Sequence, residues 1–230
     1  MKLTKNSGRL LGLLFLVSVI TGGAGTALRG LSGIDANTVD FLLELIKSSS
    51  QMKQAIYLDM FGSALGVAIA IFLYPFIKKF STRMALAYTG IAFINFTIIT
   101  LSNVIHISLL TVASEFEMGG GSNPEDYTIL SSMLYEAYYW IHFIMLILYA
   151  VGGMVLYFFF FKTKLVHQWL AIWGIIASLI VFAGGALQLA AQSVSFLLFL
   201  QNGIFVLCFI LYLLILGFRP SHCKELSKAV

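Results

Sequence analysis

The segment YLDMFGSALGVAIAIFLYPFIKKF, residues 57–80, decides the class of fold. An acid, Asp59, stands near its start and two lysines stand near its end, with only uncharged residues between them. About 30 Å of hydrocarbon is crossed by roughly 20 helical residues at 1.5 Å each. The segment therefore predicts a membrane-spanning helix over about 55–77.

The rest of the chain repeats this pattern. Of its 230 residues, 60% are hydrophobic and 10% are charged, and the mean hydropathy is +0.94. A soluble domain is about 45–50% apolar and about 25% charged, so the solvent of this chain must be lipid. The sequence predicts one all-α membrane domain over 1–230, a bundle of six transmembrane helices. The expected spans are 10–28, 55–77, 84–113, 132–161, 168–192 and 196–218, and the third and fourth are long enough to tilt or to extend beyond the bilayer.

Lysine and arginine set the expected orientation, because cytoplasmic connections are enriched in them. One set of connections holds only Arg29, Lys47 and Lys53 of the 14 basic residues, and most of the acids lie on the same side. Both termini are thus expected in the cytoplasm of a bacterial inner membrane. The net charge of +4 could suggest that the protein binds nucleic acid, but this distribution of charges between the two sides argues against it. The other set of connections holds Lys2, Lys5, Arg9, Lys78, Lys79, Arg83, Lys162, Lys164, Arg219, Lys224 and Lys228.

The first span has two interpretations. It is compatible with a cleaved signal peptide, because basic residues precede a short apolar run that is followed by the small residues TGGAGTA, 21–27. The same small residues also let membrane helices pack closely. We favour the retained helix, since its removal would leave five spans.

The longest connection, residues 29–54, is predicted to hold an extracytoplasmic amphipathic helix over 35–48. Asp35 is expected to cap its start, and Val39, Leu42, Leu43 and Ile46 fall on one face. This pattern is typical of a helix that lies on the membrane surface.

Polar side chains of five spans are predicted to lie at a similar depth, in the extracytoplasmic half. Such residues are costly in a membrane and mark sites or helix contacts. On the third span, Asn95, Ile99, Ser102 and His106 form a stripe that is expected to face the bundle interior. The candidate ligand-binding residues are Asp59, Asn103, His106, Glu136, His142, Gln188 and Gln192.

Each candidate also has a plainer interpretation. The stretch LYEAYYWIH, residues 134–142, is typical of the aromatic belt at a membrane boundary, and Glu136 could reach the headgroups. Glu136 and His142 are six residues apart and point in different directions. His142 and the glutamines Gln188 and Gln192 could instead hold helices together through hydrogen bonds.

Three functions fit the polar layer. The preferred one is a pocket for a lipid, a quinone or another small amphiphile. The first alternative is a haem or metal ion held by His106 and His142 with Asp59 or Glu136, although no HxxxH, HExxH or CxxCH motif occurs. The second is a structural subunit that packs with another membrane protein or with its own copies. No catalytic motif is recognised.

The chain resembles the bacterial multipass family known as domain-of-unknown-function family 4386. The resemblance rests on GRLLGLLFLVSVITGG at the start, on the segment 57–80 quoted above, and on KTKLVHQWLAIWGIIASL before the fifth span. It covers most of residues 8–218, and Asp59 is the polar position that we match to it. The resemblance implies a multipass membrane protein and no particular activity.

Overall fold

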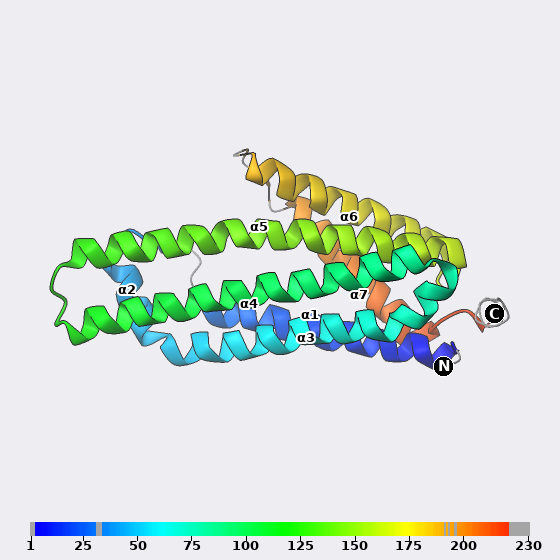
Figure 1. Cartoon of the computed structure of the whole chain (residues 1–230), viewed down its shortest axis with the longest axis horizontal. Helices are drawn as coiled ribbons and strands as arrows, with labels where there is room; N and C mark the ends of the chain where they lie inside the picture. The colour runs from blue at the N-terminus through cyan, green and yellow to red at the C-terminus, as the bar shows by residue number, and fades with distance from the viewer. Residues whose placement is uncertain (1–2, 31–33, 191, 193, 196, 221–230) are drawn as a thin grey trace.

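The computed structural model describes residues 3–30, 34–190, 192, 194–195 and 197–220, and these residues form seven α-helices and no strand (Figure 1). Lys2, Lys224 and Lys228, which contribute to the charge distribution, lie outside the described residues. The helices are α1 (Lys5–Arg29), α2 (Val39–Lys47), α3 (Ser49–Phe80), α4 (Thr82–Met118), α5 (Pro124–Thr163), α6 (Gln168–Leu189) and α7 (Leu197–Leu216).

All of these helices except α2 are long and apolar enough to cross a membrane. Each of the six also exposes large apolar side chains, such as Leu13, Phe61, Ile94 and Leu211. A soluble monomer rarely exposes so much contiguous apolar surface, so these faces contact lipid. The prediction of an all-α, multi-pass membrane protein with six spans is confirmed.

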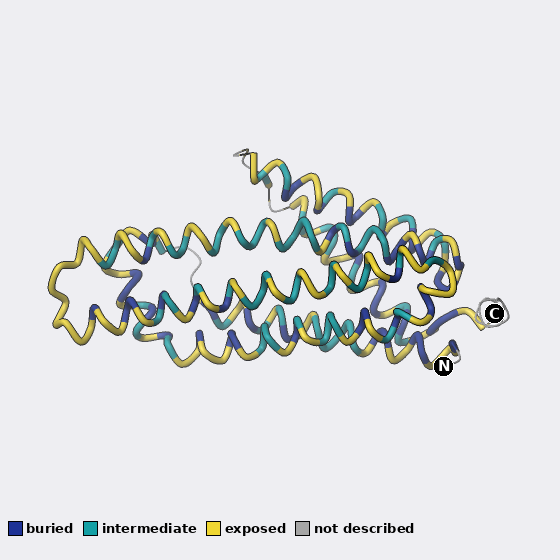
Figure 2. Tube along the Cα trace, in the orientation of Figure 1, coloured by how far each residue is buried: buried dark blue, intermediate teal, exposed yellow. Residues whose placement is uncertain are grey.

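The six long helices form a closed ring in which each helix packs against the next. The order around the ring is α1, α3, α4, α5, α6 and α7, and α7 returns to α1. The connection between α3 and α4 is the single residue Ser81, and that between α5 and α6 is also short, so these neighbours are antiparallel. Buried, intermediate and exposed residues alternate along the long helices (Figure 2), as expected where one face of a helix packs in the ring and another faces outward.

Local signals in the sequence set the helix boundaries. Thr4 and Ser7 form a capping box at the start of α1, and the Ser81 hydroxyl accepts a hydrogen bond from the Met84 N–H at the start of α4. Pro124 occupies the first turn of α5, where its missing N–H costs nothing.

The start of α1 and the end of α7 lie at the same end of the bundle, which we call the terminal end (Figure 1). A Cβ on Gly8 would lie 2.3 Å from the Phe218 backbone nitrogen, and a Cβ on Gly12 would lie 2.9 Å from the Leu213 Cβ. These glycines let α1 and α7 approach closely. α1 forms part of the ring, and its retention stays a prediction.

The opposite end, which we call the α2 end, is formed by the α4–α5 hairpin and α2. At 1.5 Å per residue, α4 with 37 residues and α5 with 40 are about 55 and 60 Å long. Both exceed the thickness of the hydrocarbon layer, so the hairpin is long enough to extend beyond it. In Figure 1 the hairpin projects past the other long helices on the left.

α2 differs from its prediction in two details. Thr38 rather than Asp35 is its N-cap residue, and the Asp35 carboxylate instead accepts hydrogen bonds from the backbone N–H and side-chain amide of Asn37. These bonds lower the pKa of Asp35. The buried face of α2 consists of Phe41, Leu42 and Leu45, and it packs mainly against α4.

The apolar side chains of α2 are therefore divided between the protein interior and the surroundings. Leu43 is 51% exposed and Val39 is 37% exposed, whereas Leu42 is fully buried. The physical reason is that α2 packs against neighbouring helices, so its orientation depends on the shape of the α4–α5 hairpin and not on a membrane plane alone.

Two apolar cores stabilise the ends of the bundle. The core at the terminal end joins all six long helices, and its members include the aromatic residues Phe76, Phe160 and Phe209. The core at the α2 end joins Phe41 and Leu45 to α3 and α4, with Phe116 among its members. The polar side chains discussed next lie between these cores.

Candidate functional site

A cavity of about 430 Å³ lies inside the ring, lined by residues of α1, α3, α4, α5 and α7. Its volume lies within the range of about 300–1,000 Å³ that is typical of small-molecule pockets. Most of its wall is apolar, and at the terminal end it reaches Ile69, Tyr157 and Phe209 of the core. The polar side chains on the wall are Ser18, Thr26, Arg29, Asp59, Ser63, Tyr88, Asn95, Ser102, Tyr138, His142, Tyr149 and Tyr157.

An ion pair between Arg29 and Asp59 forms part of this wall and joins the last residue of α1 to α3. Their side chains are only 10% and 13% exposed. A Cβ on Gly25 would lie 2.6 Å from the Asp59 Oδ1, so the glycine makes room for the carboxylate. A buried charge is strongly unfavourable without a partner, which explains why these two side chains lie together.

Asn95, Ile99 and Ser102 of α4 also face the cavity, as their spacing predicts. Asn95 lies in the part of α4 between the two cores, and its side-chain Oδ1 is buried without a hydrogen-bond partner. An unpaired buried acceptor of this kind costs about 1–3 kcal/mol. Because Asn95 also lines the cavity, its amide is a group that a bound molecule can meet there.

Three aromatic rings connect the cavity to a more deeply buried part of the bundle. Tyr138 and His142 line the cavity. The Tyr138 ring packs edge-on against His106, with centroids 4.5 Å apart, and lies 6.2 Å from the His142 ring. Tyr138 thus contacts both histidines, but His106 does not line the cavity.

His106 and Asn103 form a second polar group on α4. His106 is fully buried and Asn103 is 3% exposed. Within the part of the chain that the structure describes, both ring nitrogens of His106 and both amide atoms of Asn103 lack hydrogen-bond partners. The burial of His106 agrees with the inward-facing stripe. His106 packs against Tyr138, and neither His106 nor Asn103 lies on the cavity wall.

The remaining three candidates lie away from the cavity. Glu136 is exposed on α5, on a different side from His142, as their spacing indicates. Gln188 of α6 donates a hydrogen bond to the Tyr139 hydroxyl of α5, so it connects two helices. Gln192 is exposed beyond α6, which ends at Leu189 and not at the predicted residue 192.

The geometry gives no support to a haem or metal site. Within the described ranges, no group of three or more His, Cys, Asp and Glu side chains is arranged to hold a metal ion. His106 and His142 do not face a common space, since only His142 lines the cavity.

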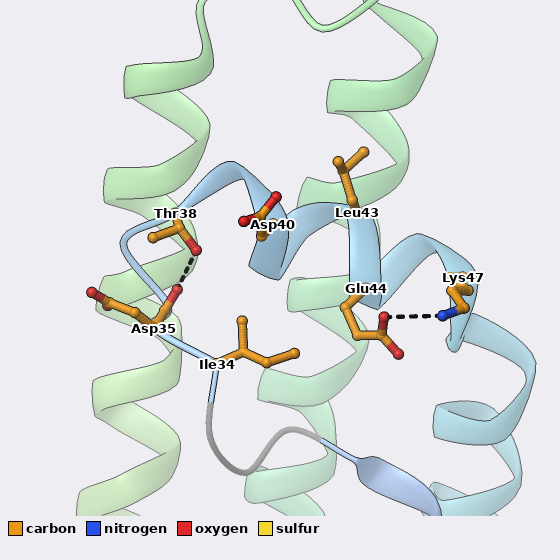
Figure 3. Close-up of a pocket in the computed structure, with 7 residues that line it drawn as sticks. All are labelled: Ile34, Asp35, Thr38, Asp40, Leu43, Glu44 and Lys47. Atoms are coloured by element: carbon orange, nitrogen blue, oxygen red, sulfur yellow. Dashed lines mark hydrogen bonds and ion pairs between the residues drawn. The ribbon is translucent and has the colours of Figure 1, made fainter.

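A second hollow, of about 530 Å³, lies on the surface around α2 (Figure 3). Most of its polar side chains are paired: the Thr38 hydroxyl donates a hydrogen bond to the Asp35 backbone carbonyl, and Lys47 lies 3.6 Å from Glu44. Because it is open and most of its polar side chains are paired, this hollow is a weaker candidate than the cavity inside the ring.

Sequence reasoning missed Arg29 as a site residue. It was counted as a loop cation because it follows the apolar run of the first span. A signal was present, since an acid one turn inside a neighbouring span requires a partner, and Arg29 is the cation nearest the end of the first span. Tyr149 was also missed because it lies in an apolar run with no polar neighbour.

Fold and cavity together define the class: a multi-pass membrane protein with an internal, mostly apolar cavity that contains a buried ion pair. The chain belongs to the family described as "Domain of unknown function (DUF4386)", which matches residues 10–217. No curated protein and no solved structure matches the chain. The resemblance seen in the sequence is thereby confirmed.

Proposed function

We propose that this protein binds a small hydrophobic or amphipathic ligand in the cavity inside its helix ring. The observation that carries the proposal is the combination of an apolar wall with a few polar groups, the Arg29–Asp59 pair and Asn95 among them. Ligand pockets typically have such walls, in which the polar groups fix the orientation of the ligand. Asp59 and His142 are the binding residues shared with the sequence-based set.

The proposal places the protein in a bacterial inner membrane with both termini in the cytoplasm. This orientation rests on the cations at the terminal end, such as Lys79, Arg83 and Lys162, and on the acids of the α4–α5 hairpin. The cavity would then lie closer to the extracytoplasmic surface at its Arg29–Asp59 end.

The test is to fill the cavity from within. Gly22 and Gly66 line the cavity, and a Cβ at either position would meet no atom within 4 Å. Gly22→Leu and Gly66→Leu therefore extend into empty space without disturbing helix packing. Overfilling a packed site costs about 1–3 kcal/mol, which corresponds to weaker ligand binding by about 5-fold to 150-fold.

Matched controls exist on the same or the next helix. Gly23 and Gly90 are exposed, do not line the cavity and also have open space around the Cβ position. Native mass spectrometry of protein purified in mild detergent should find the same bound molecule on the wild type, Gly23→Leu and Gly90→Leu. Gly22→Leu and Gly66→Leu should lose it. Equal occupancy in all five proteins, or no bound molecule in any of them and no binding of added amphiphiles, would contradict the proposal.

A further inference from the structure

We propose that the ligand is an uncharged amphiphile with one chain or one ring system, whose head group carries a hydroxyl or carbonyl oxygen. This inference rests on the proposed function and specifies the chemistry of the molecule that the cavity accepts. Three properties of the cavity wall support it: its charge balance, its unpaired hydrogen-bonding group and its size.

Charge balance excludes an ionic head group. Arg29 and Asp59 contribute one charge of each sign and already pair with each other. Among the residues that the structure describes, no other Lys, Arg, Asp or Glu lines the cavity, and His142 is its remaining titratable group apart from tyrosines. A carboxylate, phosphate or ammonium group would therefore bring an uncompensated charge into a low-dielectric site, at a cost that an uncharged head group avoids.

Asn95 supplies the hydrogen-bonding group. Its Oδ1 is buried and unpaired, and the side chain lies on the cavity wall together with Ser102 of the same helix face. An amide presents both an acceptor and a donor, so it can bind a hydroxyl or a carbonyl whichever way it is turned. A purely apolar ligand would leave Asn95 unpaired, whereas an oxygen-containing head group would satisfy it.

The size and shape of the cavity favour a slender molecule. A volume of about 430 Å³ lies near the lower limit of small-molecule pockets. On α4 the cavity extends from Tyr88 to Ser102, 14 residues or about 21 Å along the helix axis. A narrow elongated space of this kind accommodates one chain or a ring with a short tail more readily than a two-chain phospholipid.

The experiment compares probes that share a chain and differ in head group. Wild-type protein in mild detergent is titrated with tetradecanol, tetradecanoate, tetradecylamine and tetradecane at pH 7.5, and occupancy is measured by native mass spectrometry. We expect tetradecanol to bind at least about tenfold more tightly than the two charged probes. Asn95→Leu should weaken tetradecanol binding about fivefold, the effect of one neutral hydrogen bond, and leave tetradecane binding unchanged. Asn95→Ser replaces the amide by a hydroxyl, which can also form a hydrogen bond, and should restore part of the difference.

The outcomes separate this inference from the proposed function. The ligand class is wrong, but the binding cavity stands, if all four probes bind equally or if tetradecanoate binds most tightly. The same conclusion follows if a two-chain phospholipid co-purifies with the wild type and Gly66→Leu removes it. If no probe binds the wild type, or if Gly66→Leu does not reduce binding of any probe, both the ligand class and the binding function are wrong. If Asn95→Leu and Asn95→Ser both bind tetradecanol as tightly as the wild type does, the role proposed for Asn95 is wrong.

Discussion

Replacing Asp59 by asparagine should destabilise the bundle, because Arg29 would keep its charge and lose its counter-ion. Asparagine has nearly the same shape as aspartate, so packing against Gly25 is preserved and the charge alone changes. Both partners are close to 90% buried, with side chains 10% and 13% exposed. Solvent thus offers little compensation to the guanidinium.

The expected magnitude follows from this burial. Removing one partner of a buried ion pair typically costs about 3–5 kcal/mol. Because Arg29 is the last residue of α1 and retains some exposure, we expect about 3 kcal/mol for Asp59→Asn and a similar loss for Arg29→Gln. The double variant has no unpaired charge, so its loss should be well below the sum of the two single losses, with a coupling free energy of about 2–3 kcal/mol.

Equilibrium unfolding in mixed micelles of mild detergent and dodecyl sulfate, followed by tryptophan fluorescence, measures these free energies. The matched control is the exposed pair Glu44–Lys47, whose nitrogen and oxygen are 3.6 Å apart and whose side chains are 36% and 79% exposed. Glu44→Gln should change stability by less than about 0.5 kcal/mol. The reasoning is refuted if Asp59→Asn costs no more than Glu44→Gln, or if the two single losses add in the double variant.

Three further predictions concern contacts between helices. Gly25→Ala should cost about 1–3 kcal/mol of unfolding free energy, since its Cβ would lie 2.6 Å from the Asp59 Oδ1; an unchanged thermal midpoint would contradict this close packing. His106→Leu should stabilise the protein by about 1 kcal/mol or more, because it removes two buried ring nitrogens that lack partners among the described residues. A lower thermal midpoint in this variant would instead indicate that His106 has a polar partner. Gln188→Leu and Tyr139→Phe should each lower the unfolding free energy by about 0.6 kcal/mol, since both remove the same interhelical hydrogen bond. For the same reason the two losses should not add in the double variant. Full additivity in chemical unfolding would argue against that bond.

The membrane fold could be predicted because its signals are local and repeated. Long apolar runs predict the six helices, and a single residue such as Ser81 between two of them leaves no alternative to antiparallel neighbours. Helix ends were less predictable. Residues 124–131 precede the predicted fourth span, yet they belong to α5, since Pro124 begins a helix that extends beyond the bilayer.

The candidate site was predictable in its helix faces and not in its partners. Asn95 and Ser102 line the cavity because a stripe on one helix face follows directly from residue spacing. Depth alone predicts that Gln188 and Glu136 belong to the same polar layer as Asn95. Residues at one depth occur on every face of the helices, however, and these two side chains do not face the cavity. Pairing Arg29 with Asp59 requires knowing that α1 and α3 are neighbours, which no local pattern provides.

The length of α4 and α5 has a consequence for how the protein meets its surroundings. If the terminal end lies at one edge of the hydrocarbon, about 25 Å of each of these helices stands beyond the other edge. The headgroup region accounts for only about 5–8 Å of that distance. The glycine turn at 119–121 is thus held clear of the bilayer on a rigid support, where a large reagent such as an antibody or a protease can reach it from one compartment only. An epitope inserted in this turn would report which compartment that is, without changing any residue of the helix ring.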